Sequence, residues 1–82
     1  MLSDTYRSFL NYFYDDPTNI PLIFYLALLS FFVKSPAYSK EYLDMIETVY
    51  QLDFKDRGYA LVDYYYERSK TLQRRLISAC SN

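Results

Sequence analysis

Three prolines and a single glycine divide this chain of 82 residues, and each lies between stretches with helical periodicity. The first stretch places four apolar side chains on one helix face, at spacings of three and four residues: Tyr6, Phe9, Leu10 and Phe13. Residues 15–19 end this stretch, because Asp, Pro and Asn favour turns and proline disfavours a helical residue before it. The pattern predicts a first helix that begins at Ser3 or Asp4, either of which can cap it.

Two further start signals predict the next two helices. Asn19 can cap a helix that has Pro21 in its first turn, where the missing N–H costs nothing. This helix is apolar on nearly all sides over residues 22–33, so we expect it in the middle of the fold. Residues 35–36, Ser followed by Pro, repeat the signal for a third helix, which we expect to break near residues 52–53.

The last segment has the most regular pattern. Six of its side chains alternate between spacings of three and four: Val62, Tyr65, Ser69, Leu72, Leu76 and Ala79. Such spacing forms a heptad seam along one side of a helix. We expect Asp53 to cap a helix that starts at Phe54 and continues through Gly58. In the alternative, Gly58 lies in a loop and the helix starts near Tyr59.

The sequence sustains no alternation typical of β-strands. Residues 1–82 are therefore predicted to form a single all-α domain, a small four-helix bundle with a long C-terminal helix. A bundle of three helices is the alternative.

The aromatic content predicts a contact surface. With 11 Tyr, 6 Phe and 51% hydrophobic residues, the chain has more apolar surface than a lone domain of this size needs for its core. Tyrosine combines an apolar ring with a hydroxyl and loses little entropy when ordered, so it suits contacts between proteins. We expect a small intracellular protein-interaction module, such as an adaptor, an inhibitor or an assembly subunit. Regulators carried by viruses or mobile elements are examples of this class.

Two sets of residues on the last segment are candidates for that contact. Exposed tyrosine side chains next to arginine are typical of interface hot spots. On this basis we predict five partner-binding residues: Tyr59, Tyr64, Tyr66, Arg68 and Arg75. In a homodimer, the simplest assembly, the seam would meet its symmetry mate through four residues: Val62, Tyr65, Leu72 and Leu76. The alternative is that two faces of this helix pack inside one bundle.

The residue types that are missing argue against an enzyme, a metal centre or a bound cofactor. The chain has no His and one Gly, so it lacks the usual acid–base group, a common metal ligand and glycine-rich phosphate loops. Cys80 is the one cysteine, and no histidine is present to activate it. It cannot form an internal disulfide, and the N-terminus lacks the basic start of a signal peptide, so we expect a cytoplasmic protein.

Two other functions are alternatives to a protein-binding module. A helical regulator that binds nucleic acid would use the basic group of the last segment: Arg68, Lys70, Arg74 and Arg75. The net charge of −1 disfavours it. A membrane-associated protein would use residues 21–33, whose helix length of about 20 Å is shorter than the roughly 30 Å hydrocarbon core.

Overall fold

Four helices form the computed structural model, which describes residues 1–80 and the side chains of residues 1–78. Within residues 1–80 there is no strand, and the α-helices are α1 (Leu2–Asp15), α2 (Ile20–Val33), α3 (Pro36–Val49) and α4 (Ala60–Cys80). The predicted all-α fold of four helices is confirmed, and so is the long C-terminal helix, which has 21 residues. The side chains of Ala79 and Cys80 lie outside the described residues, as do Ser81 and Asn82.

Two capping predictions are confirmed. The side-chain oxygen of Asn19 accepts a hydrogen bond of 3.2 Å from the backbone N–H of Leu22, and Pro21 lies in the first turn of α2. The hydroxyl of Ser35 accepts a hydrogen bond of 3.5 Å from the backbone N–H of Tyr38. Each helix start is therefore specified locally, by one capping side chain and one proline.

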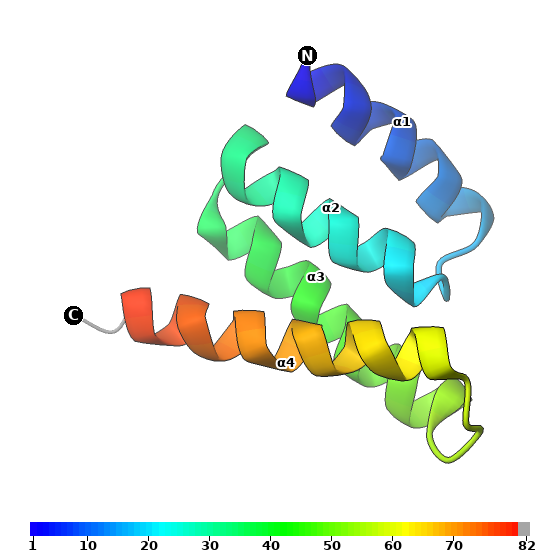
Figure 1. Cartoon of the computed structure of the whole chain (residues 1–82). Helices are drawn as coiled ribbons and strands as arrows, with labels where there is room; N and C mark the ends of the chain where they lie inside the picture. Colours follow the sequence, from blue (N-terminus) through cyan, green and yellow to red (C-terminus); the bar gives the residue numbers. More distant parts are fainter. Residues whose placement is uncertain (81–82) are drawn as a thin grey trace.

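Helix α2 is the centre of the fold, as its apolar sequence predicts. It packs against α1, α3 and α4, and Figure 1 shows it between α1 and α3. Six of its residues are buried: Ile20, Ile23, Phe24, Leu26, Ala27 and Ser30. The Ser30 hydroxyl donates a hydrogen bond of 3.0 Å to the carbonyl oxygen of Ala27, so its burial is compensated.

Helix α1 packs against the core through one buried and three partly buried side chains. The helix begins at Leu2, one residue before the earlier of its two predicted starts. Tyr6 is the buried residue of α1, and its hydroxyl lies 2.8 Å from the hydroxyl of Tyr42 in α3. The two rings meet edge to face with centroids 6.5 Å apart. Three other side chains of α1 are partly buried against the core: Phe9, Leu10 and Phe13.

The molecule is flat. Its Cα atoms extend over 33 × 33 × 16 Å along the principal axes. One side of α2 is left without a covering helix among the described residues, and Tyr25 and Phe32 are exposed there. An apolar helix at the centre of this fold therefore has both a fully buried side and an accessible side.

The predicted helix through Gly58 is wrong, and the chain leaves the helical path at Lys55, two residues after the break expected near residues 52–53. After α3 the chain makes one π-helical turn, η1 (Tyr50–Phe54). Asp56 and Gly58 then have φ angles of 64° and 75°, in the left-handed region that ends a right-handed helix. Glycine adopts this region without a steric penalty, so Gly58 lies in the loop and α4 starts at Ala60.

Replacing Gly58 with alanine is expected to destabilise the protein by about 1 kcal/mol, because an L side chain disfavours left-handed φ angles. A Cβ atom at this position would meet nothing within 4 Å, so the cost comes from the backbone conformation alone. Asp56→Gly is the matched control and is expected to be neutral or stabilising, since glycine relieves the same strain. Urea denaturation followed by circular dichroism measures both variants. Equal stability of Gly58→Ala and the wild type would contradict this account.

Candidate protein-interaction surface

The seam of α4 faces the interior of the chain's own fold. Leu76 is buried, and Val62, Tyr65 and Leu72 are partly buried against the core. Ser69 is buried as well, and its hydroxyl donates a hydrogen bond of 2.6 Å to the carbonyl oxygen of Tyr66. The four residues expected to meet a second copy are therefore used for packing within one chain. A heptad pattern identifies an apolar helix side, but the same pattern arises whichever chain supplies the neighbour.

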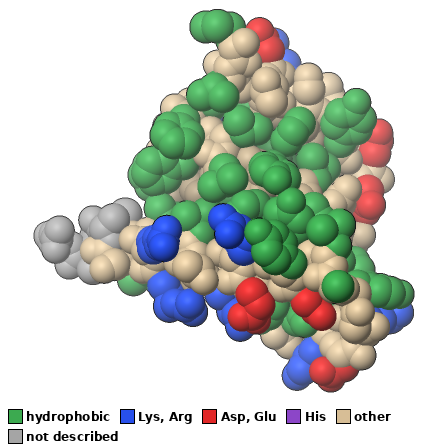
Figure 2. All heavy atoms as spheres, in the orientation of Figure 1, with side chains coloured by type: hydrophobic (Ala, Val, Ile, Leu, Met, Phe, Trp, Pro, Cys, Tyr) green, Lys and Arg blue, Asp and Glu red, His purple; other side chains and the backbone are tan. Residues whose placement is uncertain are grey.

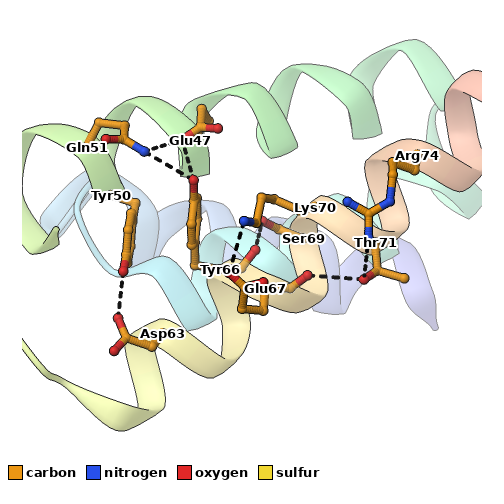
Figure 3. A network of polar contacts seen from close by, with 10 residues as sticks. All are labelled: Glu47, Tyr50, Gln51, Asp63, Tyr66, Glu67, Ser69, Lys70, Thr71 and Arg74. Carbon is orange, nitrogen blue, oxygen red and sulfur yellow. Dashed lines mark hydrogen bonds and ion pairs between the residues drawn. The ribbon is translucent and has the colours of Figure 1, made fainter. Parts of the chain in front are cut away.

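Tyr66 does not have the exposed position expected of a partner-binding residue. Its side chain is on the α3 side of α4 and the residue is 7% exposed. Its ring stacks on the ring of Tyr50, with centroids 3.6 Å apart and planes at 3°. Its hydroxyl donates a hydrogen bond of 2.8 Å to the carboxylate of Glu47 and accepts one of 3.1 Å from the side chain of Gln51 (Figure 3). Tyr66 thus joins α3 and η1 to α4.

Further polar contacts extend this junction (Figure 3). The Tyr50 hydroxyl donates a hydrogen bond of 2.9 Å to Asp63, and so ties η1 to the first turn of α4. The ammonium group of Lys70 lies 4.7 Å from the centroid of the Tyr66 ring and 3.0 Å from the carboxylate of Glu67. Lys70 is therefore engaged within the chain.

The junction shifts the pKa values of its ionisable groups. The hydrogen bond to Asp63, followed by desolvation, raises the pKa of Tyr50 to about 12. Desolvation, followed by the hydrogen bond to Glu47, raises the pKa of Tyr66. Hydrogen bonds from Gln51 and then Tyr66 lower the pKa of Glu47. The folded state therefore favours neutral tyrosines at this junction and a charged Glu47.

Alkaline pH is expected to destabilise the fold between about pH 10 and pH 12. The pKa of Tyr50 is about 12 in the folded state and about 10 in an unfolded chain. A raised folded-state pKa means that the stabilisation is complete below pH 10 and is lost as the pH rises towards 12. Urea midpoints measured at pH 8, 10 and 11.5 test this, and Tyr50→Phe is expected to show a weaker pH dependence over the same interval. A midpoint that stays constant up to pH 11.5 would count against the hydrogen-bonded junction.

A groove runs across the uncovered side of α2, and we call it the open face. It consists of three adjoining hollows of about 370, 170 and 180 Å³. The largest lies between α1 and α2 and is lined by Leu2, Thr5, Phe9, Tyr25, Leu28, Leu29 and Phe32. The second lies between α2 and α4 and is lined by Phe24, Leu28, Arg68, Thr71, Leu72 and Arg75. The third reaches α3 and is lined by Leu28, Phe31, Phe32, Ser39, Leu72 and Leu76.

The floor of the open face is formed by α2. Leu28 lines all three hollows, and Phe32 lines two of them. Phe32 is 73% exposed, whereas the residues on the opposite side of α2 are buried. Figure 2 shows hydrophobic side chains gathered over α1, α2 and the adjoining side of α4, with basic side chains along α4. The open face is therefore apolar and has a basic edge.

The edge along α4 is a single stripe of exposed residues, which we call the α4 rim: Leu61, Tyr64, Arg68, Thr71 and Arg75. These positions follow one another at spacings of three and four, so they lie on one side of the helix. The guanidinium of Arg68 lies 5.6 Å from the ring centroid of Tyr64 and 5.9 Å from that of Phe24. The hydroxyls of Tyr25 and Tyr65, 3.0 Å apart, connect α2 to α4 beside this rim.

The α4 rim brings together three of the five predicted partner-binding residues, which are Tyr64, Arg68 and Arg75. Tyr59 is also exposed, but it precedes α4 and its ring packs near Phe54, with centroids 6.1 Å apart. The basic group considered for nucleic acid is divided as well. Arg68 and Arg75 lie on the rim, whereas Lys70 pairs with Glu67, and the Arg74 guanidinium donates a hydrogen bond of 3.3 Å to Thr71.

Sequence reasoning missed the contribution of α2 to this surface. Tyr25, Leu28 and Phe32 belong to the apolar stretch that the sequence assigns to the middle of the fold. Because α2 is apolar on nearly all sides, its periodicity gives no signal for which side is covered. The narrow apolar faces of α1 and α4 indicate in part that some of α2 stays uncovered, since each of these helices can cover only a strip of it.

None of the described helices combines the length and the apolar character needed to cross a membrane. Among the described residues, no group of three His, Cys, Asp or Glu side chains is placed to hold a metal ion. Searches against protein-family models, curated proteins and solved structures find no match to this chain.

Proposed function

We propose that this protein is a small protein-interaction module, acting as an adaptor, an inhibitor or an assembly subunit, which binds a partner protein through the open face. The observation that carries the proposal is the row of exposed apolar side chains on α2, with Phe32 at 73% exposure above connected hollows. Contiguous apolar surface of this kind is costly in water and marks interaction sites.

The composition of the α4 rim supports the same proposal. Tyr64 is 54% exposed and lies beside Arg68, and tyrosine and arginine are the residue types that contribute most to binding at protein interfaces. A non-catalytic role in the cytoplasm fits a chain with no His and one Cys.

Site-specific photo-cross-linking in the native cells tests this function. A benzoylphenylalanine at position 32 is expected to give a discrete protein adduct, which mass spectrometry identifies. The matched control carries the same group at Leu52, which is 77% exposed but lies in η1, away from the open face. Adducts of equal yield at both positions, or none at position 32, would contradict binding through the open face. An adduct of twice the chain mass would identify the partner as a second copy.

A further inference from the structure

We propose that the open face binds an amphipathic α-helix of the partner protein, whose apolar side fills the groove along α2 and whose flank carries two carboxylates that pair with Arg68 and Arg75. This inference rests on the proposed function and names the chemistry of its partner. It follows from the shape of the groove, from the position of its charges and from the absence of carboxylates in its lining.

The shape of the groove fits a helix. The floor is the accessible side of α2, and the walls are α1 on one side and the α4 rim on the other. Helix α2 has 14 residues, so its floor is about 21 Å long. The three hollows are connected through Leu28, and can accept successive apolar side chains from one stripe. Grooves of this kind bind helices through anchors at positions i, i+3 or i+4, and i+7.

The charges of the groove are on one wall only. Among the residues that line the three hollows, Arg68 and Arg75 are charged, and no carboxylate is present. Neither arginine forms an ion pair with a described residue, and both are exposed. They lie seven residues apart on the same side of α4, which separates them by about 10.5 Å along the helix axis. Two carboxylates with the same i, i+7 spacing on a neighbouring helix would face them.

Arginine pairs with carboxylates through two parallel hydrogen bonds, so these contacts would fix the register of the bound helix. The rings of Phe24 and Tyr64 support Arg68 from beneath and leave its guanidinium available to a ligand. On the opposite wall, α1 contributes uncharged residues to the lining: Leu2, Thr5 and Phe9. The acidic residues of the partner are therefore expected on the flank that faces α4.

A second copy of this chain fits the groove less well than an acidic helix. Two open faces brought together would place four arginines in an apolar interface whose lining has no carboxylate. A lipid surface also fits less well, because a planar bilayer would not fill three concave hollows. The occupant that satisfies both the shape and the charge is an acidic amphipathic helix.

A displayed peptide library tests the proposal directly. Each peptide is an 18-residue amphipathic helix with a variable apolar stripe, and two flank positions seven residues apart are drawn from Glu, Gln and Lys. Selection on the wild-type protein is expected to enrich Glu at both flank positions. A selected peptide is expected to bind at least tenfold more tightly, by fluorescence anisotropy, than its counterpart with two Lys residues. The double variant Arg68→Gln/Arg75→Gln is expected to remove this preference.

Arg57→Gln is the matched control, because Arg57 is exposed in the loop that precedes α4 and lines none of the three hollows. It is expected to leave the tenfold preference unchanged, and circular dichroism confirms that each variant is folded. Enrichment of apolar stripes without Glu at the flank would overturn the charge pairing but support binding through the open face. Failure to select any helix would overturn the inference, and cross-linking at position 32 would still decide the proposed function. Binding to vesicles that contain phosphatidylserine, lost in Phe32→Ser, in place of peptide binding would also overturn it.

Discussion

Leu26→Ala is expected to lower the free energy of unfolding by about 3 kcal/mol, a large share of the roughly 4–12 kcal/mol typical of a chain this long. Leu26 is completely buried in the middle of α2, where its side chain is part of the core shared with the neighbouring helices. Alanine would leave a cavity that the surrounding side chains fill only in part. Urea denaturation followed by circular dichroism measures the change.

Leu28→Ala is the matched control, two residues further along the same helix. Leu28 is half-buried and forms part of the floor of the open face, so the same truncation is expected to cost only about 1 kcal/mol. Leu28→Ala is also expected to weaken the binding of a peptide selected on the open face. Leu26→Ala is expected to change this binding only by unfolding the protein. Equal losses of stability at the two positions would mean that α2 has no open side.

Tyr66→Ala is expected to destabilise the protein by about 3 kcal/mol, because it removes a buried aromatic ring. The variant loses the stack on Tyr50 and leaves Glu47 and Gln51 without the Tyr66 hydroxyl. Tyr66→Phe keeps the ring and removes only the hydroxyl, and an intermediate loss of about 1 kcal/mol is expected. Thermal unfolding followed by circular dichroism ranks the two variants against the wild type.

Tyr64→Ala separates a binding role from a structural one on the same helix. Tyr64 is exposed on the α4 rim, so its removal is expected to change stability by no more than about 0.5 kcal/mol. Binding of a selected peptide to the open face is expected to weaken about tenfold, as for an interface hot spot. If Tyr64→Ala unfolded the protein and Tyr66→Ala did not, the orientation of α4 described above would be wrong.

Local signals in the sequence predicted most of the fold. Asn19 and Ser35 cap their helices as expected, because a cap depends on side chains a few residues apart. Gly58 was less predictable. A glycine inside a helix costs only about 1 kcal/mol, so its presence alone did not exclude a continuous helix. The positive φ at Asp56 and Gly58 depends on how α3 and α4 are placed, which local preference does not determine.

The candidate site was predicted only in part, because exposure depends on which helix covers which side. Tyr64, Arg68 and Arg75 were predicted as partner-binding residues from their side-chain types, and the structure groups them on the α4 rim. The buried side of α4 is wider than the seam and includes Tyr66, because η1 brings the ring of Tyr50 against the ring of Tyr66. The exposed side of α2 had no signal, since nothing in a uniformly apolar helix distinguishes its covered side from its accessible one.

The single buried anchor of α1 has a consequence for how recognition could change during evolution. Tyr6 is the buried residue of α1, and its hydroxyl meets Tyr42, yet the same helix supplies a wall of the largest hollow of the open face. Substitutions on the exposed positions of α1 alter that wall without touching the tightly packed interior of α2 and α3. For a partner bound through the open face as proposed, binding preference can therefore diverge between lineages at little cost to foldability, as long as the tyrosine pair is retained.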